Sequence, residues 1–420
     1  MAKVRFILLS VLALLSLSCR KEGGDPLGEE TRKVMLLYEA GFNSLGPPIA
    51  GNIQSLKKGY LPGKGRNDDI LLVFSHITKS DYNYVTETAP SLVRLYAKRG
   101  QPCADTLKVW PVGTPVANAE TLTEVFNLVK EEFPAAGYGA VLSSHGTGWL
   151  PEDYFSHSSR YESVPRGGGS IIWSVPRRRT FGQEYCEGGT RSQEIEIRDL
   201  AKAIPYKLDY ILFDACLMGT VEVAWQLREV CDLLAVSPCE IPDKGFNYDT
   251  MAKHLLKPET PDLKAVCQDY YDAYENDSVY GATITLVDCR SLDRLAEVCR
   301  DLFSRYRLSI RTLNGSNVQV YDRMLGKKTF YAFFDLKDML REAGASDEDL
   351  ALLQGALDEA ILYKNHTPRF ISVKLERCCG LSMYLPSRSD NTTDIWHGTE
   401  FLDGFYRSNI SWNDATGLVQ

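Results

Sequence analysis

Short apolar segments rich in β-branched residues alternate with longer amphipathic segments from residue 31 onward, and this alternation constrains the fold of the chain more than any other feature. Strands that alternate with helices in this way are typical of α/β proteins. The apolar content of the strand segments is nearly continuous, which indicates a sheet covered on both faces. We therefore predict an α/β unit over 31–260, with a mainly parallel sheet flanked by helices.

The individual elements follow from length and periodicity. The expected strands are 33–38, 70–75, 106–112, 139–144, 210–214 and 233–237. The expected helices are 89–98, 122–133, 192–203 and 218–230, because each places apolar residues three and four positions apart. The segment 151–189 interrupts the pattern with Gly167-Gly168-Gly169, several prolines and the run Arg177-Arg178-Arg179, and is predicted to be a long exposed insertion.

A second pattern begins near residue 261. Helices are expected over 263–276, 292–308 and 348–363, and strands over 283–288 and 381–385. This order of elements predicts a smaller C-terminal α+β region, 261–420, packed on the first.

The N-terminus has the features of an export signal. Lys3 and Arg5 precede an apolar run over 6–17, which ends at Ser18 and Cys19. That run is shorter than the roughly 20 residues that span a bilayer as a helix. We expect a signal peptide over 1–18, lipidation of Cys19 and a polar tether over 19–30, which would place the protein on a bacterial membrane, periplasmic or at the cell surface. A secreted protein without an anchor is the alternative.

Charge and cysteine content exclude some functions. A net charge of -8 argues against a nucleic-acid partner, because binding to a phosphate backbone requires concentrated Lys and Arg. The 11 cysteines show neither the density of a disulfide-rich domain nor the paired spacings of a zinc site. Most of the thiols are therefore expected to be buried as small apolar side chains.

Two expected strands end in reactive side chains. One leads into His145 and the other into Cys216. Ligand sites in open α/β sheets form beyond the carboxyl ends of the strands, so both side chains should lie at one rim. An imidazole and the start of a helix behind Cys216 would both activate the thiol, and the amide of Gly146 could bind an oxyanion. Each motif alone is more typical of a buried structural residue than of a catalytic one.

Together and in this order, these motifs resemble the clostripain family of cysteine peptidases, whose fold is grouped with caspases, gingipains and legumain. The matching residues are His145-Gly146, Gly148-Trp149, Asp214-Ala215-Cys216 with Leu217-Met218, Tyr38 with Asn43 and Leu45, and Gly380-Leu381-Ser382 with Tyr384-Leu385-Pro386. Ser144 departs from the pattern, because relatives often have an acidic residue before the histidine.

The resemblance implies roles for further residues. Asp214 would bind the Arg or Lys side chain before the scissile bond, or else hold loop amides, and Glu240 would add a second negative charge. Self-cleavage would occur in the insertion, where the candidate sites are Arg160, Arg166, Arg177, Arg178 and Arg179. No cofactor is certain, although many relatives require calcium.

The function expected from these residues is that of an exported endopeptidase. It would hydrolyse protein or peptide substrates after Arg or Lys through Cys216 and His145, forming an acyl-enzyme. The alternatives are a cell-surface binding lipoprotein on the same fold, and a thiol hydrolase or transpeptidase that acts on another kind of amide.

Overall fold

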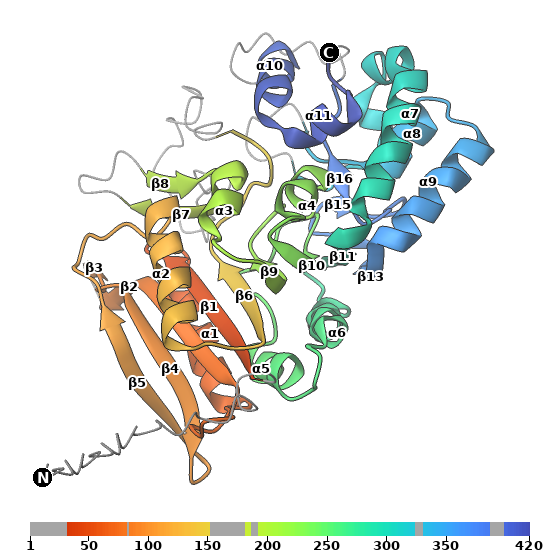
Figure 1. Ribbon diagram of the computed structural model, residues 1–420. Coiled ribbons are helices and arrows are strands. Elements are labelled where there is room, and N and C mark those ends of the chain that lie inside the picture. Colours follow the sequence, from red (N-terminus) through yellow and green to blue (C-terminus); the bar gives the residue numbers. More distant parts are fainter. Residues whose placement is uncertain (1–31, 82–83, 152–180, 186–191, 324–330, 387–398) are drawn as a thin grey trace, which may run out of the picture.

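The computed structural model describes residues 32–81, 84–151, 181–185, 192–323, 331–386 and 399–420. A ten-stranded sheet in the order β13-β11-β10-β9-β6-β1-β2-β4-β5, with β3 paired to β2, forms its centre (Figure 1). The five central strands are parallel to one another: β10 (Cys231–Val236), β9 (Leu208–Asp214), β6 (Gly137–Ser143), β1 (Lys33–Gly41) and β2 (Ile70–Asp81).

Both edges of the sheet are antiparallel. One edge consists of β3 (Tyr84–Glu87), β4 (Ser91–Lys98) and β5 (Gln101–Val109). The other edge consists of β11 (Thr283–Asp288) and β13 (Ile361–His366). The sheet is therefore mixed, with the expected parallel order at its centre. It also continues across residue 261, because β11 and β13 come from the C-terminal region.

Helices cover both faces of this sheet (Figure 1). Side chains alternate along β1, so that Met35 and Leu37 pack in one apolar cluster while Leu36 and Tyr38 pack in the other. The first cluster includes side chains of α1 (Gly46–Lys58), α5 (Tyr248–Leu256) and α6 (Leu263–Tyr274). The second includes side chains of α2 (Ala119–Glu132), α3 (Ile197–Ala203), α4 (Val221–Leu227), α7 (Leu292–Arg311), α8 (Leu336–Glu342) and α9 (Asp347–Ala360).

Shorter elements complete the described residues. They are the pairs β7 (Phe181–Tyr185) with β8 (Ser192–Ile195), β12 (Phe334–Asp335) with β16 (Ser382–Met383) and β14 (Arg369–Phe370) with β15 (Val373–Lys374), and the helices α10 (Thr399–Asn409) and α11 (Ser411–Thr416).

Away from Cys216, four sequence-based predictions of local structure were wrong in whole or in part. Segment 89–98 is strand β4 rather than a helix. Leu92 and Leu95 are buried in the two apolar clusters on opposite faces of the sheet, so the buried residues of this strand imitate helical spacing. Segment 192–203 begins as strand β8, and segment 348–363 ends in strand β13. The end of the expected exposed insertion is strand β7, where Phe181 is buried.

Candidate active site

The ends of β6 and β9 bring His145 and Cys216 to one rim of the sheet. These strands are adjacent and parallel, with Ser143 opposite Asp214, and the Ser144 amide donates to the Asp214 carbonyl at 3.3 Å. His145 and Cys216 each follow this pair by two residues. The backbones beyond it are in close contact, since a Cβ on Gly146 would lie 2.7 Å from the Cys216 carbonyl oxygen. Glycine is therefore required at this position.

Contacts from two other segments hold His145, which is 5% exposed. Its Nε2 lies 3.0 Å from the Ser44 hydroxyl, in the turn between β1 and α1. Ser44 can accept the proton of the Nε2–H tautomer, which leaves Nδ1 as the basic nitrogen. The neighbouring Ser144 hydroxyl donates to the Ala40 carbonyl at 2.6 Å. Ser144 therefore fixes the backbone before the imidazole to the end of β1.

Strand β7 supports the histidine from the other side. The Gly182 amide donates to the His145 carbonyl at 3.0 Å, and Phe181 lies opposite Gly146 as an antiparallel bridge. In a bridge of this kind the flanking residues exchange the hydrogen bonds, so the Gly146 amide points away from β7. That direction is compatible with the expected role of the amide toward an oxyanion.

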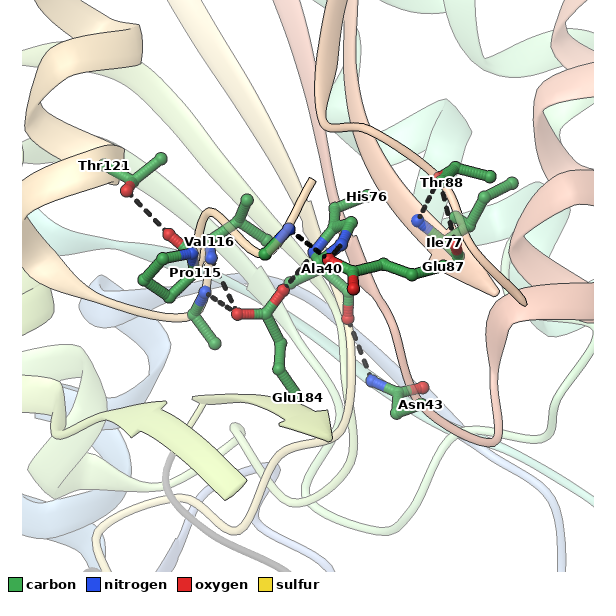
Figure 2. A network of polar contacts seen from close by, with 12 residues as sticks. Ala40, Asn43, His76, Ile77, Glu87, Thr88, Pro115, Val116, Thr121 and Glu184 are labelled. Atoms are coloured by element: carbon green, nitrogen blue, oxygen red, sulfur yellow. Dashed lines mark hydrogen bonds and ion pairs between the residues drawn. The ribbon is translucent and has the colours of Figure 1, made fainter. Parts of the chain in front are cut away.

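A buried polar network holds β7 in place (Figure 2). Glu184 on β7 contacts Nδ1 of His76 on β2, and His76 Nε2 lies 3.0 Å from Glu87. The other oxygen of Glu184 accepts from the amides of Val116 and Ala117 at 2.7 and 2.9 Å. This network links the strand behind His145 to β2 and to the segment before α2.

The Cys216 thiol is partly exposed and lies against the loop after β10. The Ile241 amide lies 3.4 Å from Sγ, close enough to donate to the sulfur. Leu217 has a φ of 60°, an unfavourable conformation for a residue with a side chain, and its amide donates to the Cys239 carbonyl at 3.0 Å. The chain therefore turns sharply directly after the thiol.

The helix expected behind Cys216 begins later than predicted. Helix α4 begins at Val221, with Thr220 as its N-cap, rather than at residue 218. Gly219 lies against the backbone of Ser237 and Pro238, where a Cβ would be 2.3 Å from the nearest atom. This close approach requires an extended turn, so α4 starts several residues beyond the thiol. The backbone donor next to the sulfur is therefore the Ile241 amide and not the first turn of a helix.

Asp214 lies beneath this turn and is 7% exposed. Its carboxylate accepts a hydrogen bond from the Tyr248 hydroxyl at 2.6 Å, and the Ser143 hydroxyl lies 3.5 Å away. Burial raises the pKa of Asp214 to about 6, and the two hydroxyl donors limit that rise. Gly245 lies against the carboxylate, because a Cβ at this position would be 2.4 Å from Oδ2 of Asp214. Its φ of +62° also favours glycine.

Glu240 forms an ion pair with Arg323. Arg323 binds its carboxylate through two nitrogens, with Nη2 2.9 Å from Oε1. Burial lowers the pKa of the Arg323 guanidinium, but the hydrogen bonds and charge of Glu240, with the nearby Cys216, outweigh this effect and raise the pKa. Glu240 therefore lies close to the thiol, but its charge is balanced by Arg323 in this structure.

Comparisons with known proteins identify the family to which this fold belongs. The model of the clostripain family matches residues 167–416, which is more than half of the chain and includes Cys216. The chain belongs to the clostripain family. His145 lies upstream of the matched residues, so its placement depends on the register of β6 with β9.

Solved structures and a curated clostripain relative extend the comparison. An inactive zymogen C11 protease from Parabacteroides distasonis is 26% identical with a TM-score of 0.72, covering 91% of this chain and 97% of that one. A secreted C11 cysteine protease from Bacteroides thetaiotaomicron, 23% identical over 91% of this chain and 98% of that one, shares the fold with a TM-score of 0.69. Clostripain from Hathewaya histolytica is 25% identical over 239 residues, 52% of this chain and 41% of that protein, so the match spans less than half of that clostripain.

Several residues at this clostripain-family site had no distinguishing signal in the sequence. Ser44 and the Ile241 amide reach the site from the loops after β1 and β10, and neither residue type in a loop indicates a contact with a catalytic side chain. The network of His76 and Glu184 joins residues 108 positions apart. A buried histidine at the end of a predicted strand was the one available clue to that network.

Some expectations lie outside the described residues or find no support within them. Cys19, the signal and tether segments, and the candidate cleavage sites Arg160, Arg166 and Arg177–Arg179 are outside the described ranges. Within the described part of the chain, no three His, Cys, Asp or Glu side chains form a group that could hold a metal ion. We therefore assign no residue and no step to calcium. None of the described helices has the length and apolarity needed to cross a membrane.

Proposed function

We propose that this protein is an exported cysteine endopeptidase that cleaves after Arg or Lys, with Cys216 as nucleophile and His145 as its proton-transfer partner. The observation that carries the proposal is the register of β6 with β9, which brings the two residues to adjacent strand ends. Membership of a family of cysteine peptidases supports the same chemistry.

The proposed reaction has two steps. The Cys216 thiolate attacks the carbonyl carbon of the scissile bond, and the C–N bond breaks as the His145 imidazolium gives its proton to the leaving amine. The resulting thioester is hydrolysed by water, whose proton passes to His145 as the thiolate is released. The amides of Gly146 and Cys216 would stabilise the oxyanion of each tetrahedral intermediate.

Substrate preference is assigned to Asp214. A carboxylate in a pocket largely shielded from water binds a guanidinium or ammonium group with directional, charge-assisted hydrogen bonds. Glu240 would contribute a second charge when its ion pair with Arg323 opens. Incubation with fluorogenic peptides that carry Arg, Lys or a neutral residue before the scissile bond tests the function directly. If none of these peptides is cleaved, the result favours the alternative of a binding lipoprotein. If only non-peptide amides are cleaved, the result favours the thiol hydrolase.

Self-processing is expected in the segment between His145 and Cys216. This segment offers Arg160, Arg166 and Arg177–Arg179 among Gly and Pro residues, whose content favours an accessible backbone. The relative from Parabacteroides distasonis is described as an inactive zymogen, which is consistent with a precursor form. Intact-mass analysis should find two fragments in the wild type and one intact chain in Cys216→Ala. Equal nicking in both, or a fully active uncut wild type, would contradict self-processing.

Export and lipidation are proposed from Lys3, Arg5 and the apolar run that ends at Cys19. Protein recovered from the membranes of a bacterial host should begin at Cys19 and carry the added mass of acyl chains. Cys19→Ala should abolish that mass and release the protein from the membrane fraction. An unmodified N-terminus at another residue would show simple secretion.

Calcium dependence is an expectation of the family resemblance alone, and activity measured after chelation and again after calcium addition tests it.

A further inference from the structure

Glu39 on β1 is a fully buried acid without a hydrogen-bond partner. It is 0% exposed, and neither carboxylate oxygen accepts a hydrogen bond of good geometry, although the Ser143 hydroxyl beside it is close enough to lower its pKa. Buried polar groups are almost always hydrogen-bonded, because leaving one unpaired costs the energy of removing it from water. An unpaired carboxylate is the most costly group of this kind. Its presence therefore calls for an explanation.

The position of Glu39 in the sheet places it beside the proposed specificity pocket. Glu39 is opposite Ser143, and Ser143 is opposite Asp214, so the three side chains lie in one row on the same face of the sheet. With strands roughly 4.8 Å apart, the two acids come from backbones about 10 Å apart with the small Ser143 between them. This spacing lets both carboxyl groups converge on one ligand.

The surroundings of Glu39 favour its neutral form. Burial is the main reason that the pKa of Glu39 is raised well above its ordinary value, and the nearby Asp214 raises it further. The Ser143 hydroxyl has the opposite, smaller effect. Tyr248 on α5 is also close, since the charges of Asp214 and Glu39 both raise its pKa.

We propose that Glu39 is the second carboxylate of this pocket, and that Glu39 and Asp214 together bind the guanidinium of an arginine side chain. The proposal rests on the assignment of Asp214 to the pocket. A guanidinium has five donors in a planar fork and can serve two carboxylates at once, whereas an ammonium is a single point charge. The pair should therefore favour Arg over Lys.

Binding would couple to proton release. The proton of Glu39 leaves to solvent as the guanidinium arrives, and the new ion pairs replace the missing donors. Gly245 lies directly against the Asp214 carboxylate, so a side chain that reaches both acids must displace the loop that carries Gly245. Gly245 presents no side chain to Asp214, and the Tyr274 hydroxyl donates to its carbonyl at 2.9 Å.

A set of isosteric variants tests the proposal in the full-length enzyme. Substrates should differ only in the residue before the bond: Arg, Lys or citrulline, the neutral analogue of Arg. Glu39→Gln should lower kcat/KM for the Arg peptide by about 10- to 100-fold and change the citrulline peptide by less than about threefold. Glu222→Gln is the matched control, because Glu222 is another buried acid, and burial raises its pKa to about 7. Unlike Glu39, it accepts hydrogen bonds from the Tyr384 amide and the Tyr406 hydroxyl.

A binding measurement separates this proposal from the proposed function. Calorimetry of Cys216→Ala protein with an uncleaved Arg peptide, in buffers of different ionisation enthalpy, should show proton release that Glu39→Gln removes. An unchanged Arg-to-citrulline ratio and unchanged proton release in Glu39→Gln would overturn the role of Glu39. If the Arg peptide binds no better than the citrulline peptide even before Glu39 is changed, then the Arg or Lys specificity itself fails, and with it this proposal.

Stability gives a third readout that does not depend on activity. A carboxyl whose pKa is raised by folding contributes stability below its unfolded pKa, ordinarily 4.5 for Glu, and loses that contribution as pH rises toward the folded pKa. Glu39→Gln should therefore match the wild-type Tm near pH 4 and exceed it increasingly at higher pH. A constant Tm difference across this range would show that Glu39 is not the unpaired acid that the structure indicates.

Discussion

Replacing Cys216 with Ala should lower kcat/KM for the best Arg or Lys peptide by at least about 10,000-fold, since the thiol forms the acyl-enzyme. His145→Ala should cause a comparable loss, and the double variant should be little worse than either, because the two residues act as a unit. The measurement is the steady-state hydrolysis of a fluorogenic peptide by each purified variant.

Two matched variants sharpen this result. Cys103→Ala removes another partly exposed thiol, on the edge strand β5, and should retain full activity. Ser44→Ala removes the contact to Nε2 of His145 and should cost roughly 10-fold in kcat with a smaller change in KM, because the ring loses one orienting partner. Full activity in Cys216→Ala would end the nucleophile assignment, whatever the other variants show.

Asp214→Asn should lower kcat/KM for an Arg peptide by roughly 30-fold or more, equivalent to about 2 kcal/mol, because a buried cation is left poorly paired. Neutral peptides should lose much less. Equal losses for charged and neutral peptides would indicate instead that Asp214 holds the loop around Gly245 in place.

The pH dependence gives an independent check of Asp214. Its pKa is raised to about 6, so the carboxyl group is neutral below that pH and charged above it. In the wild type, kcat/KM for the Arg peptide should therefore rise as pH increases through about 6, and Asp214→Asn should lack this rise. Tyr248→Phe removes a donor that lowers the pKa, so the rise should move to higher pH.

The sequence predicted the parallel centre of the fold well. The five parallel strands β1, β2, β6, β9 and β10 were all anticipated, because fully buried strands consist almost entirely of apolar residues with few alternatives. Strands β1 and β2 continue beyond their predicted ends, to Gly41 and Asp81. The edges were harder to predict. Strand β4 buries residues on both of its faces, which imitates helical spacing. The last residues of segment 348–363 become an edge strand through pairing with β11, a long-range contact that local periodicity does not record.

The reactive residues were also visible in the sequence, because His145 and Cys216 each follow an apolar strand and share a family motif. Their surroundings were not visible. The turn that places the Ile241 amide against Sγ depends on close backbone contact between Gly219 and the segment after β10. Likewise, the charge expected from Glu240 meets Arg323, a partner 83 residues away.

The sequence by itself determined which strands are buried and which two of them end in a thiol and an imidazole, since both properties follow from the order of side chains along the chain. The tertiary structure alone decided which strands are neighbours, and therefore that Ser143 and Asp214 lie opposite each other and that Glu39 falls in the same row. The physical reason is that strand order and register arise from packing helices on both faces of the sheet. Such contacts between distant segments leave no periodic signal in any one of them.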